Sequence, residues 1–408
     1  MDKYKTTGSW LKSLASWRLI LFLILLVATN LSIAVGQISL GLSLLLLIFA
    51  GIRYGQWPPR TGVEVSAAWL ALWALAMIPF SADVAQSTLY FRRFFLFSAL
   101  WVASAVSTTE QRRFWMLGFL VAGAMAISLY GQIKIAMTTG GVFTTRFFGA
   151  SNPMSSGAIS MLVVLVVIGF LFVRGYRHRW RLGMAVAALP VLVGLLQTMT
   201  RSAFLGTVAG IGTMILLVRP RLFLIFLALA VVFGVGMANF GEDVVSPRLW
   251  RRINPEYVIS GKNTTLRLEM WRGGWEMIKA HPLTGVGDCD LIALSPQYYG
   301  DENTVYHGHL HSNPVMLAVI WGVPGFILAQ LFIFTPLILL VKRWRSLAGG
   351  PAGVAASPAL AGWILGAVGA WAGFYVAGFT EWYFGDAEPM VLYLAIIGVA
   401  FGTVSKRQ

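Results

Sequence analysis

The chain has 408 residues, of which 57% are hydrophobic and only 12% charged, and its mean hydropathy is +0.73. A soluble domain of this size cannot bury so much apolar surface, and 13% aromatic residues are incompatible with disorder, so both classes are excluded. A polytopic α-helical membrane protein remains.

The net charge of +15 would indicate nucleic acid binding in a soluble chain. Here cations flanking membrane spans account for most of it, and no nucleic acid partner is expected. The single cysteine, Cys289, excludes an intramolecular disulfide and a cysteine-cluster metal site.

Twelve apolar runs have a length typical of membrane spans. They lie at residues 19–36, 38–54, 63–80, 89–107, 114–135, 153–173, 182–199, 202–218, 221–239, 312–341, 359–379 and 387–404. The second run is short and is expected to tilt or to be partly re-entrant. Because it follows the first run directly, the pair predicts a membrane hairpin and not a cleaved signal. The sequence thus predicts an all-α fold of about twelve transmembrane helices. Nine lie in residues 1–239 and three in residues 312–408, with an outer loop at 240–311 between them.

The cations indicate the orientation. If the N-terminus is cytoplasmic, both termini are cytoplasmic and seven cytoplasmic segments hold most of the basic residues, as the positive-inside rule requires. These residues are Lys3, Lys5, Lys12, Arg18, Arg53, Arg60, Arg112, Arg113, Arg174, Arg177, Arg179, Arg181, Arg219, Arg221, Lys342, Arg343, Arg345, Lys406 and Arg407. The short outer loops near Asp83 and Glu381 carry no cation.

The remaining cations lie on or near the outer face, where orientation alone disfavours them. They are Arg92, Arg93, Lys134, Arg146, Arg201 and the basic residues of the 240–311 loop, namely Arg248, Arg251, Arg252, Lys262, Arg267, Arg272 and Lys279. Arg201 occupies a tight turn between two spans, where it is either a snorkelling anchor or, as we favour, an anion ligand. For Arg92 and Arg93 the two readings are about equally favoured. Several arginines around one outer cavity would suit a phosphate or pyrophosphate, because a guanidinium matches phosphoryl oxygens bidentately.

One helix is predicted inside the outer loop, from Thr264 to Ala280. Thr264 or Thr265 could cap it, and His281-Pro282 ends it. Its apolar residues form one amphipathic stripe, which predicts a helix lying along the membrane surface. The stripe consists of Leu268, Trp271, Trp275 and Ile278.

Three histidines, His307, His309 and His311, end the loop at alternate positions. They could share one face and bind zinc, but no carboxylate or cysteine lies close in the sequence, so we favour His311 as a catalytic base. His307 and His309 would then be supporting residues. Two weaker candidates are Asp288-Cys-Asp290, which has the form of a nucleotide-sugar transferase motif but no soluble domain around it, and Asp83, an acid in an early outer loop. The outer face of a bacterial inner membrane lacks ATP and nucleotide sugars, so a transferase there needs a donor that is already activated on a lipid.

Four segments together resemble the bacterial O-antigen ligases, within the O-antigen ligase and polymerase superfamily. His311-Ser312, nine residues and then Gly322-Val-Pro-Gly325 look like the family's histidine–glycine signature, and Arg201-x3-Leu205 is similar to its arginine–leucine motif. The other two segments are Arg267 through His281-Pro-Leu-Thr-Gly-Val-Gly287, and Arg146-Phe-Phe-Gly-Ala-Ser-Asn-Pro153. The resemblance covers most of the chain, including the large outer loop before the histidine motif.

The resemblance implies a GT-C-like helical fold in the bacterial inner membrane, with the active site facing the periplasm. It implies transfer of a polysaccharide from undecaprenyl pyrophosphate to a sugar hydroxyl of lipid A–core, inverting and without metal or cofactor. His311 would be the base, and Arg201 and Arg267 would hold the pyrophosphate. Further substrate contacts are expected from Arg92, Arg93, Arg146, Arg272 and His309.

Three other functions remain open from the sequence. An O-antigen polymerase uses the same donor, but such enzymes usually carry two sizeable outer loops, whereas the loop at 136–152 is short. A protein glycosyltransferase of the same superfamily is less favoured. A transporter of lipid-linked sugars would more often place ionisable residues in mid-span and show an internal repeat, which is not visible here.

Overall fold

The computed structural model describes residues 2–139, 145–147, 149, 152–173, 175–244, 247–254, 257, 261–301, 304–349 and 357–403. Within these ranges the regular structure is helical, with no strand. The helices, in chain order, are α1 (Asp2–Leu31), α2 (Ile33–Tyr54), α3 (Glu64–Met77), α4 (Val84–Phe91), α5 (Ser98–Val106), α6 (Glu110–Thr139), α7 (Pro153–Phe172), α8 (His178–Gln197), α9 (Arg201–Val218), α10 (Pro220–Val244), α11 (Pro247–Ile253), α13 (Lys262–Ala280), α14 (Asn313–Gly349), α15 (Pro358–Ala377) and α16 (Ala387–Phe401). Short 3₁₀ helices cover Ile78–Phe80, Arg92–Phe97 and Ser295–Gln297.

The predicted class, an all-α polytopic membrane protein, is confirmed. Among the described residues, ten helices are long and apolar enough to cross a membrane, and two shorter apolar helices, Glu64–Phe80 and Ala387–Phe401, correspond to the third and twelfth predicted runs. The second run is longer than expected, because α2 begins at Ile33 after Ser32, whose hydroxyl accepts a hydrogen bond from the Val35 amide. Its 22 residues are enough to span the bilayer.

The centre of the bundle is formed by α7 and α15. More than four fifths of the apolar window of each helix is buried inside the protein, whereas none of the corresponding window of α10 is. The two central helices pack closely because glycines line their contact: a Cβ added at Gly169 of α7 would overlap the backbone of Gly366 in α15. Small residues of this kind let backbones approach in a membrane, where burial of apolar side chains gives little driving force.

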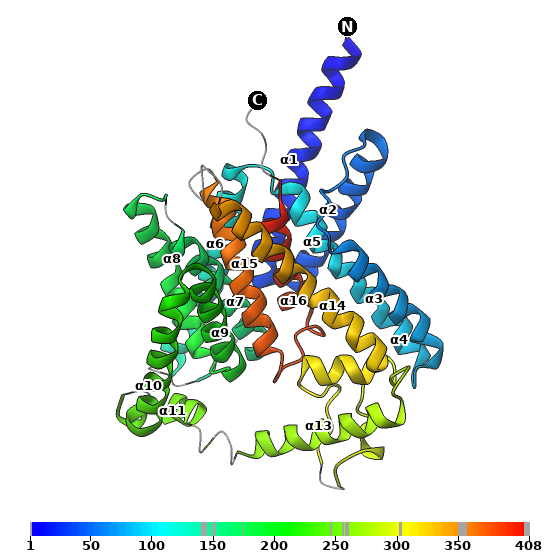
Figure 1. Ribbon diagram of the computed structural model, residues 1–408, viewed down its shortest axis with the longest axis vertical. Coiled ribbons are helices and arrows are strands. Elements are labelled where there is room, and N and C mark those ends of the chain that lie inside the picture. Colours follow the sequence, from blue (N-terminus) through cyan, green and yellow to red (C-terminus); the bar gives the residue numbers. More distant parts are fainter. Residues whose placement is uncertain are drawn as a thin grey trace.

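The N-terminal end of α1 and the C-terminal end of α16 lie toward the same end of the molecule, and α13 lies across the opposite end (Figure 1). Two arginines predicted to be cytoplasmic meet the end of α16. Arg113 donates to the carbonyl oxygen of Thr403 at 2.5 Å, and Arg343 donates to that of Phe401 at 3.0 Å. Cations at a helix C-terminus satisfy its free carbonyl groups and its dipole.

Helix α14 is broken at Gly322, whose φ of +66° lies in the left-handed region. The break exposes backbone carbonyls, and the segment that follows α13 uses them. The amide of Val286 donates to Val319 O at 2.8 Å and that of Gly287 to Ile320 O at 3.1 Å, while Trp73 Nε1 donates to Trp321 O at 2.9 Å. The first glycine of the histidine–glycine signature, Gly322, therefore makes the site where the segment after α13 docks.

Helix α13 differs in detail from the predicted outer helix. It begins at Lys262, two residues earlier, with Gly261 as its N-cap in place of either threonine, because the Thr264 amide already bonds to Gly261 O. It ends before His281, as predicted. The apolar stripe divides: Leu268 and Trp275 are exposed, whereas the other two members pack against the protein.

Candidate active site

A cavity of about 210 Å³ lies between the ends of α7, α9 and α13 and the loops before α14 and α16. Its polar lining residues are Arg146, Thr200, Arg201, Ser202, Arg267, His307, His311 and Glu381, and its apolar lining residues are Met154, Met199, Leu266 and Met270. Four of the predicted site residues, three arginines and one histidine, therefore meet in one place.

The turn between α8 and α9 brings two of the arginines together. The chain reverses at Met199, which has a φ of +49°, and α9 begins at Arg201. Arg146 is held to this turn, because its Nε donates to Thr198 O at 2.9 Å and its Nη2 to Thr200 Oγ1 at 3.3 Å. The two guanidinium groups thus enter the cavity from adjoining segments.

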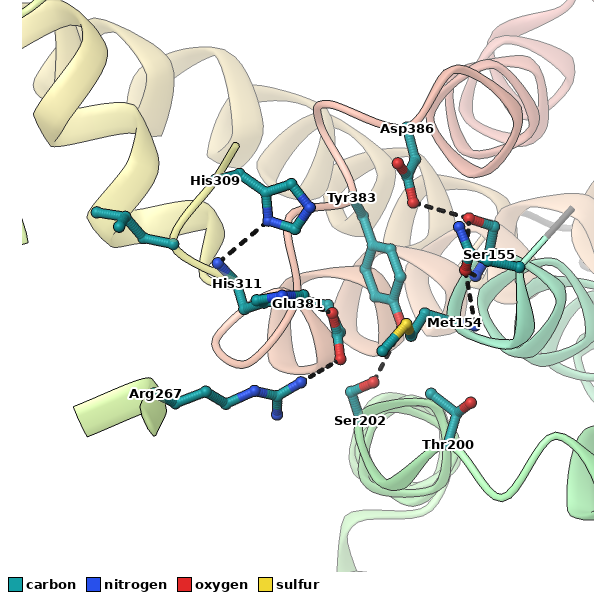
Figure 2. Close-up of polar contacts among 12 residues, drawn as sticks. Met154, Ser155, Thr200, Ser202, Arg267, His309, His311, Glu381, Tyr383 and Asp386 are labelled. Atoms are coloured by element: carbon teal, nitrogen blue, oxygen red, sulfur yellow. Dashed lines mark hydrogen bonds and ion pairs between the residues drawn. The ribbon is translucent and has the colours of Figure 1, made fainter. Parts of the chain in front are cut away.

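Arg267 comes from the first half of α13. The helix approaches α14 closely because Gly274 lies against Leu310 and Val315, and Trp271 Nε1 donates to Leu310 O at 3.0 Å. From this position Arg267 Nη2 reaches Glu381 Oε1 at 2.5 Å (Figure 2).

His311 stands immediately before α14, in a left-handed backbone conformation with φ of +47°. The next residue, Ser312, takes the N-terminal capping position, and its hydroxyl accepts from the Val315 amide at 3.5 Å. The imidazole Nδ1 lies 3.0 Å from Glu381 Oε2. A proton on Nδ1 makes the ring a donor to this carboxylate and leaves Nε2 as the acceptor nitrogen.

Glu381, which the sequence does not mark as a site residue, links His311 to Arg267. Glu381 is only 5% exposed. It belongs to the loop between α15 and α16, and Asn313 holds that loop. The backbone amide of Asn313 donates to Gly378 O at 2.6 Å, and its side-chain Oδ1 accepts from the backbone amide of Phe384 at 3.2 Å. The only signal in the sequence is an acid in a short loop that is predicted to be on the outer side and carries no cation.

Two further bonds fix the same loop from α7 and α9. The hydroxyl groups of Tyr383 and Ser202 lie 3.0 Å apart, and Ser155 Oγ donates to Asp386 Oδ2 at 2.7 Å (Figure 2). Burial raises the pKa of Asp386 above its usual range, opposed by the Ser155 hydrogen bond. The glutamate position is therefore determined by contacts to α7, α9 and α14.

The other two histidines do not act alike. His307 lines the cavity, and burial lowers its pKa. His309 is not among the lining residues. Its Nδ1 accepts from the backbone amide of His311 at 3.3 Å, and burial, with a smaller contribution from His311, lowers its pKa to about 4.

Besides His309, three arginines predicted to contact substrate lie outside the cavity lining. Arg92 and Arg272 are exposed. Arg93 binds Asp288, with Nη1 3.0 Å from Oδ1, and its guanidinium stacks 4.1 Å from the centre of the Tyr90 ring. Substrate contacts by these three arginines stay predictions, and of the adjacent pair it is Arg93 that points into the protein.

The acidic candidates have structural partners. Asp83 caps α4, since its carboxylate accepts from the Gln86 amide at 2.8 Å. Asp288 pairs with Arg93, and although this cation opposes the effect, burial raises the pKa of the carboxyl group. Among the described residues, no group of three or more histidine, cysteine, aspartate or glutamate side chains is arranged to hold a metal ion.

Residues 186–330 match the family model described as O-antigen ligase. A search of curated proteins finds no match. The matched segment runs from α8 to beyond the break in α14, so it includes Arg201, Arg267 and His311, whereas Arg146 and Glu381 lie outside it. The match supports a function of the O-antigen ligase or polymerase type. Over this segment the chain is similar to the O-antigen ligases, and the resemblance indicated by its motifs is confirmed.

Proposed function

We propose that this protein is an O-antigen ligase of the bacterial inner membrane. It transfers a polysaccharide from undecaprenyl pyrophosphate to a sugar hydroxyl of lipid A–core at the periplasmic face, with both chain termini in the cytoplasm. One observation carries the proposal: Arg146, Arg201, Arg267 and His311, which are distant in sequence, line the same cavity. The family match supports the class of reaction.

The three arginines bind the donor pyrophosphate. Each guanidinium stays charged at any physiological pH and offers several donors in a plane, so it can bind phosphoryl oxygens bidentately. Arg267 uses one terminal nitrogen for Glu381 and retains other N–H groups for the ligand. Negative charge develops on the pyrophosphate as the sugar leaves, and fixed cations in a partly water-excluded cavity stabilise that charge more than they stabilise the bound donor.

His311 is the base. Nε2 takes the proton of the acceptor hydroxyl while the hydroxyl oxygen forms a bond to the anomeric carbon. The bond from that carbon to the pyrophosphate oxygen breaks on the opposite side, so the configuration inverts. Glu381 at Nδ1 orients the ring and stabilises the imidazolium that forms, as a carboxylate does for other catalytic histidines. The scheme needs no metal ion or cofactor.

Purified protein in EDTA, given lipid-linked glycan and rough lipopolysaccharide, tests the proposal. We expect glycan to appear on lipopolysaccharide, seen as a ladder on a gel. His311→Ala and Arg201→Ala should abolish transfer while the protein still inserts and folds. Arg219→Ala, at the other end of α9, is the matched control and should transfer normally.

Each alternative gives a different product. A polymerase extends the lipid-linked glycan and leaves lipopolysaccharide unmodified. A transporter forms no covalent product at all. Near wild-type transfer by either site variant would remove the role given to that residue.

A further inference from the structure

We propose that His309 is a positioning residue, which holds the backbone of His311 in its left-handed conformation by accepting a hydrogen bond from the His311 backbone amide. This inference rests on the proposed role of His311 as the base. It replaces, for His309, the substrate contact that the sequence suggests.

The backbone at His311 needs such support. Among the described residues, only Met199 and His311 combine a side chain with a positive φ. A non-glycine residue in this region is strained, and it persists only where its surroundings determine it. Here the strained residue turns the chain from the outer loop into α14 and aims the imidazole at Glu381.

The bond from His309 spans the strained residue. The His311 amide lies 3.3 Å from His309 Nδ1, and the two rings meet edge to face with their centres 4.3 Å apart (Figure 2). The bond requires a neutral imidazole with its proton on Nε2. Burial lowers the pKa of His309 to about 4, so the ring is neutral throughout the physiological range. A neutral ring of this kind cannot act as a cation for a pyrophosphate.

The neighbouring histidines support the same division of roles. His307 and His311 line the cavity, whereas His309 does not. Gly308, between His307 and His309, accepts a hydrogen bond at its carbonyl oxygen from the Leu291 amide at 3.3 Å, so the loop is also held from its other side. His309 therefore acts through the residue it bonds, from outside the cavity.

Two amide substitutions separate the possible roles. In His309→Asn the side-chain oxygen falls near the position of Nδ1 and can accept the amide of a residue two positions later, as asparagine commonly does in turns. In His309→Gln the amide falls near the position of Nε2. The comparison also includes His309→Ala, which offers neither atom.

We expect His309→Asn to keep kcat within about threefold of the wild type. His309→Gln and His309→Ala should each lose about tenfold or more in kcat, a size that one hydrogen bond can account for, while KM for the lipid-linked donor stays unchanged. Binding of inorganic pyrophosphate, measured by calorimetry, should be equal in all four proteins and shows that each variant is folded with an intact arginine cavity.

Several results would overturn the inference: activity rescued by glutamine but not by asparagine, equal loss in all three variants, equal activity in all three, or a rise in KM in place of a fall in kcat. Loss of pyrophosphate binding in the variants would also contradict it, because it would place His309 in the donor site. If the wild-type protein neither transfers glycan nor binds pyrophosphate, the proposed function itself fails.

Discussion

Replacing Glu381 by glutamine tests the link between the base and the pyrophosphate site. The carboxylate is almost fully buried and contacts two groups at once, Nδ1 of His311 at 3.0 Å and Nη2 of Arg267 at 2.5 Å. Glutamine has nearly the same shape, so it changes the charge and the acceptor capacity and little else. We expect a slow enzyme that still folds.

The size of the effect follows from the two bonds. A hydrogen bond to a charged group contributes about 1.5–3 kcal/mol, and the bond to His311 strengthens when the ring becomes an imidazolium. Loss of that bond alone lowers kcat by about 10- to 100-fold, since about 1.4 kcal/mol corresponds to a factor of ten. Loss of the bond to Arg267 leaves a guanidinium less well oriented, so KM for the donor should change as well.

The assay is transfer of glycan to rough lipopolysaccharide by purified protein, with donor concentration varied to separate kcat from KM. Asp386→Asn is the matched control, because Asp386 is an acid in the same loop that does not line the cavity, and asparagine keeps an oxygen that can accept the 2.7 Å hydrogen bond from Ser155. We expect the control to retain transfer within a few-fold of wild type. If Glu381→Gln transfers as fast as wild type, or if both variants lose activity equally, the role given to Glu381 is wrong.

Three further predictions concern other parts of the site. Arg267→Ala should raise KM for the lipid-linked donor and lower kcat by about 100-fold or more, because it removes one donor that stabilises the developing charge. In the same assay, Lys279→Ala at the other end of α13 should leave both constants near wild type. Gly322→Ala should destabilise the protein by about 2 kcal/mol or more in thermal unfolding. The left-handed conformation alone costs about 1–2 kcal/mol for alanine, and the added Cβ would overlap the docked segment. Gly349→Ala is the control: nothing lies within 4 Å of its added Cβ, so its thermal unfolding should be unchanged. The pKa of His309 falls from its ordinary 6.5 to about 4 on folding, so between these pH values the unfolded chain takes up a proton that the folded protein does not. Stability should therefore fall with decreasing pH across this window, and His309→Asn should lose that slope in an acid unfolding series. The same slope in the variant and the wild type would contradict this.

Much of the fold follows from local signals. The twelve apolar runs all correspond to helices, because a spanning segment must satisfy its own backbone hydrogen bonds and length with apolarity is enough to reveal it. The end of α13 at His281 follows likewise from the histidine–proline pair. The start of that helix was misplaced by two residues, since a glycine can serve as N-cap without any side-chain bond.

The membership of the site was predicted in part. The sequence points to Arg146, Arg201 and Arg267 because topology disfavours cations on the predicted outer face. It points to His311 because an imidazole before the tenth span can act as a base and matches the histidine–glycine motif. All four residues line the cavity. Arg93 had the same sequence signal, yet it bonds to Asp288, because the segment docked against the broken helix brings this acid to it. No pattern in the sequence distinguishes these two outcomes.

The sequence alone determined that the chain is a bundle of membrane helices, and it placed a motif-bearing histidine directly before the tenth apolar run. Both features depend on composition and spacing along the chain. The tertiary structure alone decided that Glu381 joins His311 to Arg267, and that His309 bonds to the backbone of its neighbour. The contacts of Glu381 depend on where α13, α14 and the loop before α16 meet, and positions 114 residues apart in the chain carry no local sign that they will touch. The bond from His309 joins residues only two apart, but it depends on the left-handed backbone of His311, which no sequence pattern marks.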